Sequence, residues 1–114
     1  GGGALVNVLS VLSWLNLPQA GTYAASKAAA WALTNGLRNE LRAQRTRVVA
    51  VHAAFIDTEM ARHVAGPKVA PREVALQTLA ALEAGRDEVL ADEITRQVKQ
   101  GLVSEPPVYV QPPR

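Results

Sequence analysis

Two short apolar runs, residues 4–9 and 47–53, lie on either side of a long helical stretch, and this order limits the folds open to the chain. Both runs are nearly continuously apolar, which is typical of parallel strands covered on both faces. Between them, residues 22–44 carry alanine and leucine at spacings of three and four, the period of a helix with one apolar face. The order strand, helix, strand predicts a parallel pair joined by a right-handed crossover.

The second half of the chain continues the alternation. Residues 71–84 predict a helix that begins at a proline and ends at Gly85, a typical residue for a helix C-terminus. Residues 88–91 predict a third strand, and Asp92 can cap a last helix that runs to about residue 100. The sequence therefore predicts an α/β fold with about three parallel strands and flanking helices.

Charge and composition exclude several classes of partner. The chain has 114 residues, enough for one small domain, and its apolar content of 48% is ordinary for a globular protein. The net charge is only +2, and the densest basic cluster, over residues 38–47, contains an acidic residue and no aromatic one. A nucleic-acid surface usually carries more charge with interleaved aromatics, so we interpret this cluster as a solvated helix face and expect no nucleic-acid partner.

Metal and membrane sites are not indicated. The chain has no cysteine, which excludes disulfides and thiolate metal sites, and His52 and His63 lie far apart with no third ligand at a useful spacing. No run of about eighteen apolar residues predicts a membrane span. No basic segment precedes an apolar core as in a signal peptide, so a cytoplasmic location is the default expectation.

Three polar side chains form the candidate catalytic set. Tyr23 and Lys27 are four residues apart at the start of the predicted helix, so one turn places them on one face. Ser10 ends the preceding strand and can reach the same place. A phenol works as an acid or base near neutral pH only if a positive charge favours its phenolate, and an ammonium one turn away is such a charge. The alternative is a surface tyrosine and lysine, with a serine that bonds its local backbone.

The segment from residue 4 to residue 41 resembles the catalytic segment of the short-chain dehydrogenase/reductase family. That family has Asn-Val-x-Ser on a buried strand, matched here by Asn7-Val8-Leu9-Ser10. A tyrosine follows thirteen residues after the serine, as Tyr23 does, and it opens Tyr-x-x-Ser-Lys-Ala-Ala, which residues 23–29 match. Ser13 lies only ten residues before the tyrosine, so the resemblance selects Ser10 rather than Ser13.

The resemblance implies a role for each residue in an NAD- or NADP-dependent exchange between an alcohol and a ketone or aldehyde. Tyr23 would be the acid/base and would also contact the cofactor, and Lys27 would favour the phenolate of Tyr23 and hydrogen-bond the nicotinamide ribose. Ser10 would hold the oxygen of the small-molecule substrate. Ile56 and Thr58 would meet the nicotinamide carboxamide, although Thr58 is also a good helix N-cap. The family usually has Pro-Gly where this chain has alanines at positions 53 and 54.

Four other residues are candidates for structural or pocket roles. Asn7 is expected to tie neighbouring backbone together. Trp14, Met60 and His63 are candidates for the substrate pocket, with apolar packing as an equal alternative.

The family's glycine-rich dinucleotide loop is absent from this chain. That loop follows the first strand, whereas the three glycines here precede one. We therefore interpret residues 1–103 as the C-terminal half of a doubly wound, Rossmann-type sheet that lacks the dinucleotide-binding half, and residues 104–114 as an extended or disordered proline-rich tail. NAD and NADP are not distinguished. The chain alone is expected to be inactive.

Two other functions are alternatives to a dehydrogenase fragment. The first is a truncated remnant that acts as an interaction module, since helix 22–44 has a small-residue face and its family counterpart often lies in a homo-oligomer interface. The second is a hydrolase with Ser10, His52 and Asp57 as a triad. No Gly-x-Ser-x-Gly elbow surrounds the serine, so the sequence disfavours a hydrolase.

Overall fold

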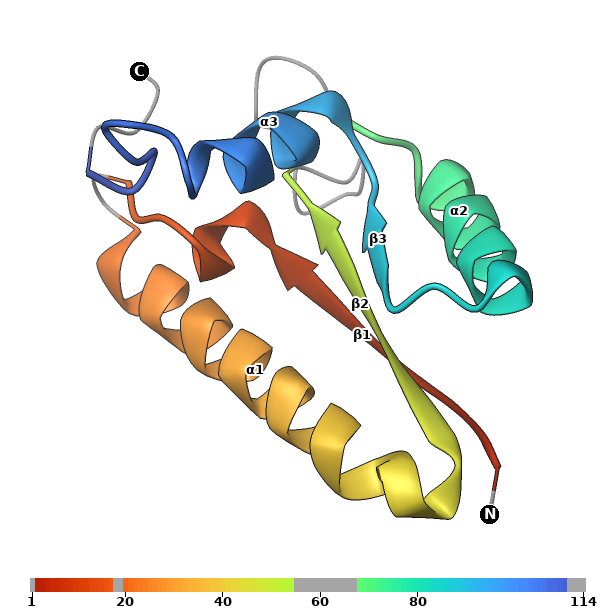
Figure 1. Ribbon diagram of the computed structural model, residues 1–114. Helices are drawn as coiled ribbons and strands as arrows, with labels where there is room; N and C mark the ends of the chain where they lie inside the picture. Colours follow the sequence, from red (N-terminus) through yellow and green to blue (C-terminus); the bar gives the residue numbers. More distant parts are fainter. Residues whose placement is uncertain (1, 18–19, 55–67, 111–114) are drawn as a thin grey trace.

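The computed structural model describes residues 2–17, 20–54 and 68–110. Its strands are β1 (Gly3–Ser10), β2 (Thr46–Ala53) and β3 (Glu88–Leu90), and they form one parallel sheet in the order β1-β2-β3 (Figure 1). The predicted α/β architecture with parallel strands is confirmed.

Three α-helices accompany the sheet at nearly the predicted positions. α1 covers Gly21–Glu40 and continues as a 3-10 turn, η2, over Leu41–Gln44. α2 covers Pro71–Ala84 and α3 covers Glu93–Gly101. The predicted helix over residues 22–44 is therefore correct in position, but its last turn tightens into a 3-10 turn. Arg45, in the left-handed conformation with φ of 57°, then directs the chain into β2.

The middle strand, β2, forms the core of the sheet and is buried from Val48 to Ala53. Its side chains alternate between two faces. Val49 and Val51 pack with Val74 and Ala81 of α2 in one apolar cluster. The opposite face is covered by α1 and α3, so helices cover both sides of this strand, as a parallel sheet requires.

Strand β1 departs from the prediction, because it is not covered on both faces. Leu5 and Val6 are 36% exposed and Val8 is 51% exposed, and burial begins only at Leu9. The physical reason is position: β1 is the outer strand of the described sheet and pairs with β2 alone. Its second edge presents unpaired N–H and C=O groups beside apolar side chains, an arrangement that favours association with another strand.

We expect this edge to make the isolated chain self-associate, and Val8→Lys to reduce that association. A charged residue on an edge strand opposes pairing with a further strand at little cost to an exposed position. Light scattering after size-exclusion chromatography would measure the mean mass of both proteins. Leu76→Lys, which places the same charge at a 48% exposed position on α2, is the matched control. Equal masses for Val8→Lys and the unchanged protein would contradict the prediction.

Helix α1 follows the expected apolar stripe only in part: Leu37 is half-buried and Trp31 packs against Trp14. Its buried residues are Ala24 and Thr34, whereas Leu33 is 64% exposed. Thr34 is fully buried because the Asn7 side-chain amide donates to its Oγ1 (3.0 Å) and its hydroxyl donates to the Ala30 carbonyl (2.7 Å). Asn7 therefore ties β1 to α1 through a side chain, a structural role as predicted, although its partner is a hydroxyl rather than backbone.

Residues 104–110 form turns rather than an extended tail. The Val108 N–H donates to the Gly101 carbonyl (2.8 Å), and Val108 joins an apolar cluster centred on Trp14 and Val98. A Cβ on Gly101 would lie 2.7 Å from the Val108 Cβ, so this close approach requires glycine. The described part of the predicted tail is thus folded against the end of α3.

Candidate functional site

Ser10 is the last residue of β1 and lies at the end of the sheet where ligands of parallel α/β proteins bind. It is 8% exposed, and its Oγ accepts a hydrogen bond from the Leu12 N–H (3.1 Å), which caps the short 3-10 helix η1 (Val11–Ser13). A hydroxyl that accepts one bond still has its hydrogen to donate. The local backbone role and a role toward a substrate oxygen are therefore compatible.

Tyr23 and Lys27 lie on one face of the first turns of α1, as their spacing predicts. The Lys27 Nζ is 5.6 Å from the centroid of the Tyr23 ring, which is within the range of a cation–π contact. Tyr23 is 52% exposed, so its phenol is accessible to a ligand. The structure thus places the ammonium near the face of the Tyr23 ring.

The ends of β1 and β2 meet at the same edge of the sheet. The register pairs Ser10 with Ala53, the last residue of β2. The segment with Ile56 and Thr58 begins two residues beyond this pair. Ile56 and Thr58, and with them Asp57, Met60 and His63, lie outside the described residues.

Asp92 connects the end of β2 to the start of α3 through two hydrogen bonds, of which the sequence predicts one. One carboxylate oxygen accepts from the Thr95 N–H (2.7 Å), which confirms the predicted helix cap. The other accepts from the Ala54 N–H (2.9 Å), so the same side chain ties the residue after β2 to the start of α3. The sequence predicts Asp92 as the helix cap. It does not predict the second hydrogen bond, because Ala54 lies 38 residues before Asp92 in the chain.

His52 belongs to a buried network and has its partners away from Ser10. Its ring is fully buried, stacks on Trp14 with centroids 4.4 Å apart, and contacts the Glu88 carboxylate through Nε2 (3.1 Å). Lys99 of α3 pairs with the other oxygen of that carboxylate. The hydrogen bond with His52, followed by the effects of Lys99, lowers the pKa of Glu88 from 4.5 to about 2 against the opposing effect of burial. No sequence pattern predicts this network, since its members are distant along the chain.

The lowered pKa of Glu88 predicts a pH dependence of stability. A carboxylate whose pKa is lower in the folded state contributes stability that is complete above its unfolded value and is lost as the pH falls toward the folded value. For Glu88 this window runs from about 4.5 down to about 2. We expect Glu88→Gln to be less stable at neutral pH and to lack this part of the acid-induced loss, as measured by urea unfolding at several pH values.

A matched control removes the same charge elsewhere. Glu83→Gln changes an exposed carboxylate on α2 and should retain the acid-induced loss of the unchanged protein. Parallel pH profiles for Glu88→Gln and the unchanged protein would show that the network does not contribute as described.

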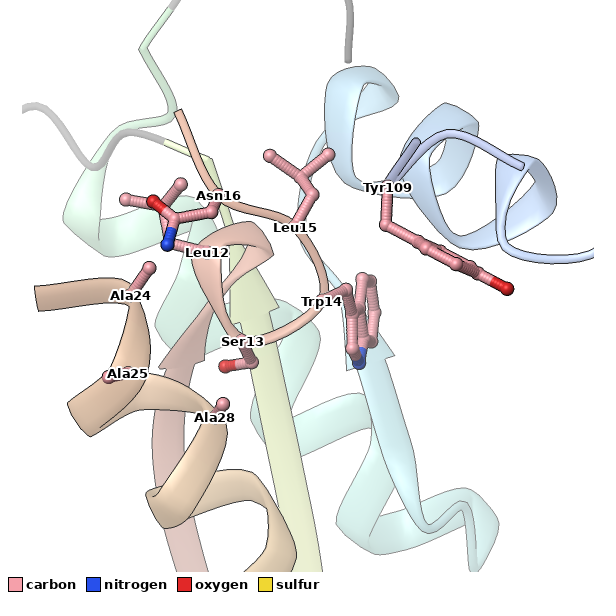
Figure 2. A pocket seen from close by; sticks show the side chains of 9 residues that line it. All are labelled: Leu12, Ser13, Trp14, Leu15, Asn16, Ala24, Ala25, Ala28 and Tyr109. Atoms are coloured by element: carbon pink, nitrogen blue, oxygen red, sulfur yellow. The ribbon is translucent and has the colours of Figure 1, made fainter. Parts of the chain in front are cut away.

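Trp14, a candidate for the substrate pocket, packs in the core. It is 8% exposed, stacks on His52 and meets Trp31 edge to face with centroids 6.2 Å apart. One side of the same residue also lines a cavity between η1 and α1 (Figure 2). The predicted packing of Trp14 is confirmed, whereas its place in a substrate pocket stays a prediction.

The described ranges, residues 2–17, 20–54 and 68–110, indicate neither a metal site nor a membrane-spanning helix. No cluster of three or more His, Asp or Glu side chains in these ranges is arranged to bind a metal ion. None of the helices in the same ranges has the length and apolar content to cross a membrane.

Known proteins similar to this chain are oxidoreductases. A family model described as short chain dehydrogenase matches residues 1–68. An uncharacterized oxidoreductase of Escherichia coli, YgfF, is 52% identical over 66 residues, which are 57% of this chain and 26% of that protein. A 3-beta-hydroxysteroid dehydrogenase of Comamonas testosteroni is 38% identical over 87 residues, which are 75% of this chain and 34% of that protein.

A solved structure agrees with these matches. The crystal structure of a short chain dehydrogenase from Burkholderia cenocepacia in complex with NADP superimposes with a TM-score of 0.85 at 47% identity, and the match covers 92% of this chain and 44% of that one. The chain therefore spans about a quarter to less than half of the length of the relatives it matches.

Proposed function

Because the chain belongs to the short-chain dehydrogenase family, we propose that it carries the proton-transfer half of an NAD(P)-dependent oxidoreductase. The reaction interconverts an alcohol and a ketone or aldehyde. The observation that carries the proposal is the placement of Lys27 5.6 Å from the ring of Tyr23, at the start of the helix that follows Ser10. A phenol beside an ammonium at the carboxyl end of a parallel sheet is suited to proton transfer at an oxygen.

Each of the three side chains has one task. The nicotinamide, when bound, supplies or accepts the hydride at the substrate carbon. Tyr23 gives its phenol proton to the substrate oxygen in the reducing direction and takes it back in the oxidising direction. Lys27 stabilises the phenolate through its positive charge. Ser10, which accepts from the Leu12 N–H, donates its own hydrogen to the substrate oxygen and holds it in line.

The residues present fit a nicotinamide nucleotide. The ammonium of Lys27 and the phenol of Tyr23 offer polar groups to a ribose from the exposed start of α1. We assign Ile56 and Thr58 to the carboxamide, because their segment leaves β2 beside Ser10. The Burkholderia cenocepacia structure holds NADP, which makes NADPH the first cofactor to test and NADH the second.

The proposal predicts that activity needs both halves of the fold. We expect purified chain with NADPH or NADH to reduce none of a panel of ketones and aldehydes. A chimera in which the N-terminal half of the Burkholderia cenocepacia protein precedes Gly1 should oxidise NADPH in the presence of such a substrate. The loss of absorbance at 340 nm, the usual readout for this cofactor, measures the rate. Turnover by the chain alone would contradict the first expectation. A folded chimera that binds NADPH without turnover on any substrate would contradict the second.

A second candidate function is an interaction module that forms a homo-oligomer through α1. The observation that favours it is the exposed small-residue surface of that helix, with Leu33 64% exposed beside Ala29 and Ala32. Leu33→Lys would then convert a discrete dimer to a monomer in light scattering, whereas Val8→Lys would not. A dimer sensitive only to Val8→Lys would assign the association to the edge of β1 and remove the support for the module.

A further inference from the structure

Ser10 and Trp14 lie at the two ends of the short helix η1. Ser10 is its N-cap, through the hydrogen bond that its Oγ accepts from the Leu12 N–H (3.1 Å). Trp14 is its C-cap, and the Trp14 N–H donates to the Val11 carbonyl (2.9 Å). Strand β1 fixes the backbone of Ser10, whereas the bond to η1 fixes the direction of its side chain. A helix of three residues is not stable by itself, so the position of η1 depends on what Trp14 packs against.

The ring of His52 is the surface on which Trp14 packs. The two ring centroids are 4.4 Å apart and the ring planes differ by 30°. His52 is fully buried in β2, and the register places it opposite Leu9, the residue before Ser10. Trp31 also contacts the indole, but edge to face and with centroids 6.2 Å apart. Because a close-packed interior transmits displacements, a movement of the His52 ring would move Trp14 and the end of η1.

Glu88 sets the orientation of the His52 ring. Its carboxylate lies 3.1 Å from Nε2 of His52, and Lys99 pairs with its other oxygen. The lowered pKa of Glu88, about 2, keeps this carboxylate ionised at neutral pH. An ionised carboxylate can only accept, so Nε2 of His52 carries a hydrogen and donates it. Nδ1 has no partner among the described residues, so in that part of the chain the bond to Glu88 is the polar contact that fixes the ring.

We propose that His52 is a positioning residue for Ser10. It acts through Trp14 and η1, and Glu88 holds its ring in place. The role rests on the proposed function, since it requires that the Ser10 hydroxyl donates to a substrate oxygen. A displacement of about 1 Å in such a group can cost about 10²-fold in rate, so a support behind η1 affects catalysis without contact with the substrate.

Amide hydrogen exchange in the ¹⁵N-labelled chain tests the support of η1 without any activity. It compares the Leu12 N–H, bonded to Ser10, with the Val74 N–H, bonded to the Ala70 carbonyl at the start of α2. We expect His52→Ala to accelerate exchange at Leu12 about three- to tenfold more than at Val74, the effect of one stacked pair of rings. His52→Phe retains a ring against Trp14 and should recover most of the protection.

Val49→Ala is the matched control. It shortens another buried side chain of β2, on the opposite face, where Val49 packs in one cluster with Val74. This variant should accelerate exchange at Val74 more than at Leu12. Equal acceleration of both amides by His52→Ala would indicate general loss of stability and would overturn the proposal.

A second variant covers the case in which His52→Ala does not fold. Glu88→Leu removes the hydrogen bond to the His52 ring by a change at a partly exposed residue. It should accelerate exchange at Leu12 more than at Val74, and equal rates at the two amides would again overturn the proposal.

A double-mutant cycle in the chimera tests the link to Ser10. Ser10→Ala should lower kcat about 10²- to 10³-fold, the effect of one lost donor to the reacting oxygen. His52→Ala should lower kcat about tenfold when Ser10 is present and less than about twofold when Ser10 is alanine, because its effect passes through the hydroxyl. Equal losses in the two backgrounds would overturn the proposal. An unchanged rate for Ser10→Ala would instead contradict the proposed function, whereas the exchange rates would still report the support of η1 by His52.

Discussion

Tyr23→Phe in the active chimera is expected to lower kcat about 10²- to 10⁴-fold, the usual contribution of a positioned acid/base. The substitution removes only the phenol oxygen. The phenylalanine ring keeps the position 5.6 Å from the Lys27 ammonium, and a half-exposed ring contributes little to the core, so the fold should be retained. Steady-state rates with NADPH, together with a thermal unfolding curve, measure the two quantities separately.

The effect should fall mainly on kcat, with a smaller effect on KM for NADPH, because the phenol also offers a polar group to the ribose. A matched control, Gln44→Ala, changes an exposed residue at the far end of the same helical segment and should retain full activity. A loss below tenfold for Tyr23→Phe, with an intact fold, would remove the acid/base role from this residue. A large loss that is accompanied by unfolding would instead assign it a structural role.

Trp14→Ala is expected to lower the free energy of unfolding of the chain by about 3–5 kcal/mol, as for other large aromatic residues removed from a core. Trp14 joins three parts of the fold: it packs with Val11 of η1, stacks on His52 of β2, and lies in one cluster with Val98 of α3. Removal of the indole leaves a cavity beside His52 of β2. The sheet cannot move to fill this cavity, so the contacts of the indole are lost without replacement. Urea unfolding followed by circular dichroism measures the loss.

Two variants test whether burial causes this loss. Trp31→Ala removes the same side chain from a half-buried position on α1, and we expect a loss of less than about half as much, since less area leaves water at that site. Trp14→Phe retains a ring over His52 and should recover part of the stability. A similar loss for the two alanine variants would show that the position of Trp14 in the core is not the cause.

Most of the element order could be predicted from the sequence, because it depends on neighbours along the chain. The stretch from residue 71 to residue 84 begins at Pro71 and is followed by Gly85, and these two residues predict the bounds of α2 that the structure has. Asp92 caps α3 as predicted, since a cap requires only a side chain and an amide three residues later. The Tyr23–Lys27 pair follows in the same way from one helical turn.

The prediction was wrong where a property depends on segments that meet only in the folded chain. The apolar run of β1 predicts burial on both faces, yet Leu5 and Val8 are exposed because β1 is the outer strand of the described sheet. The alanine and leucine period of α1 predicts one apolar face toward the core, yet on that helix Leu33 is exposed and the fully buried residue is Thr34, whose hydroxyl accepts a hydrogen bond from Asn7 of β1.

The sequence by itself determined the α/β alternation, the two ends of α2 and the placement of Tyr23 and Lys27 on one helix face, all of which depend on residues close together along the chain. Only the tertiary structure decided that Trp14 covers His52, that Glu88 joins His52 to Lys99, and that the Ser13 hydroxyl is buried with no hydrogen-bond partner among the described residues. These contacts join residues far apart along the chain. Their identity depends on how helices and strands pack, which no local period encodes.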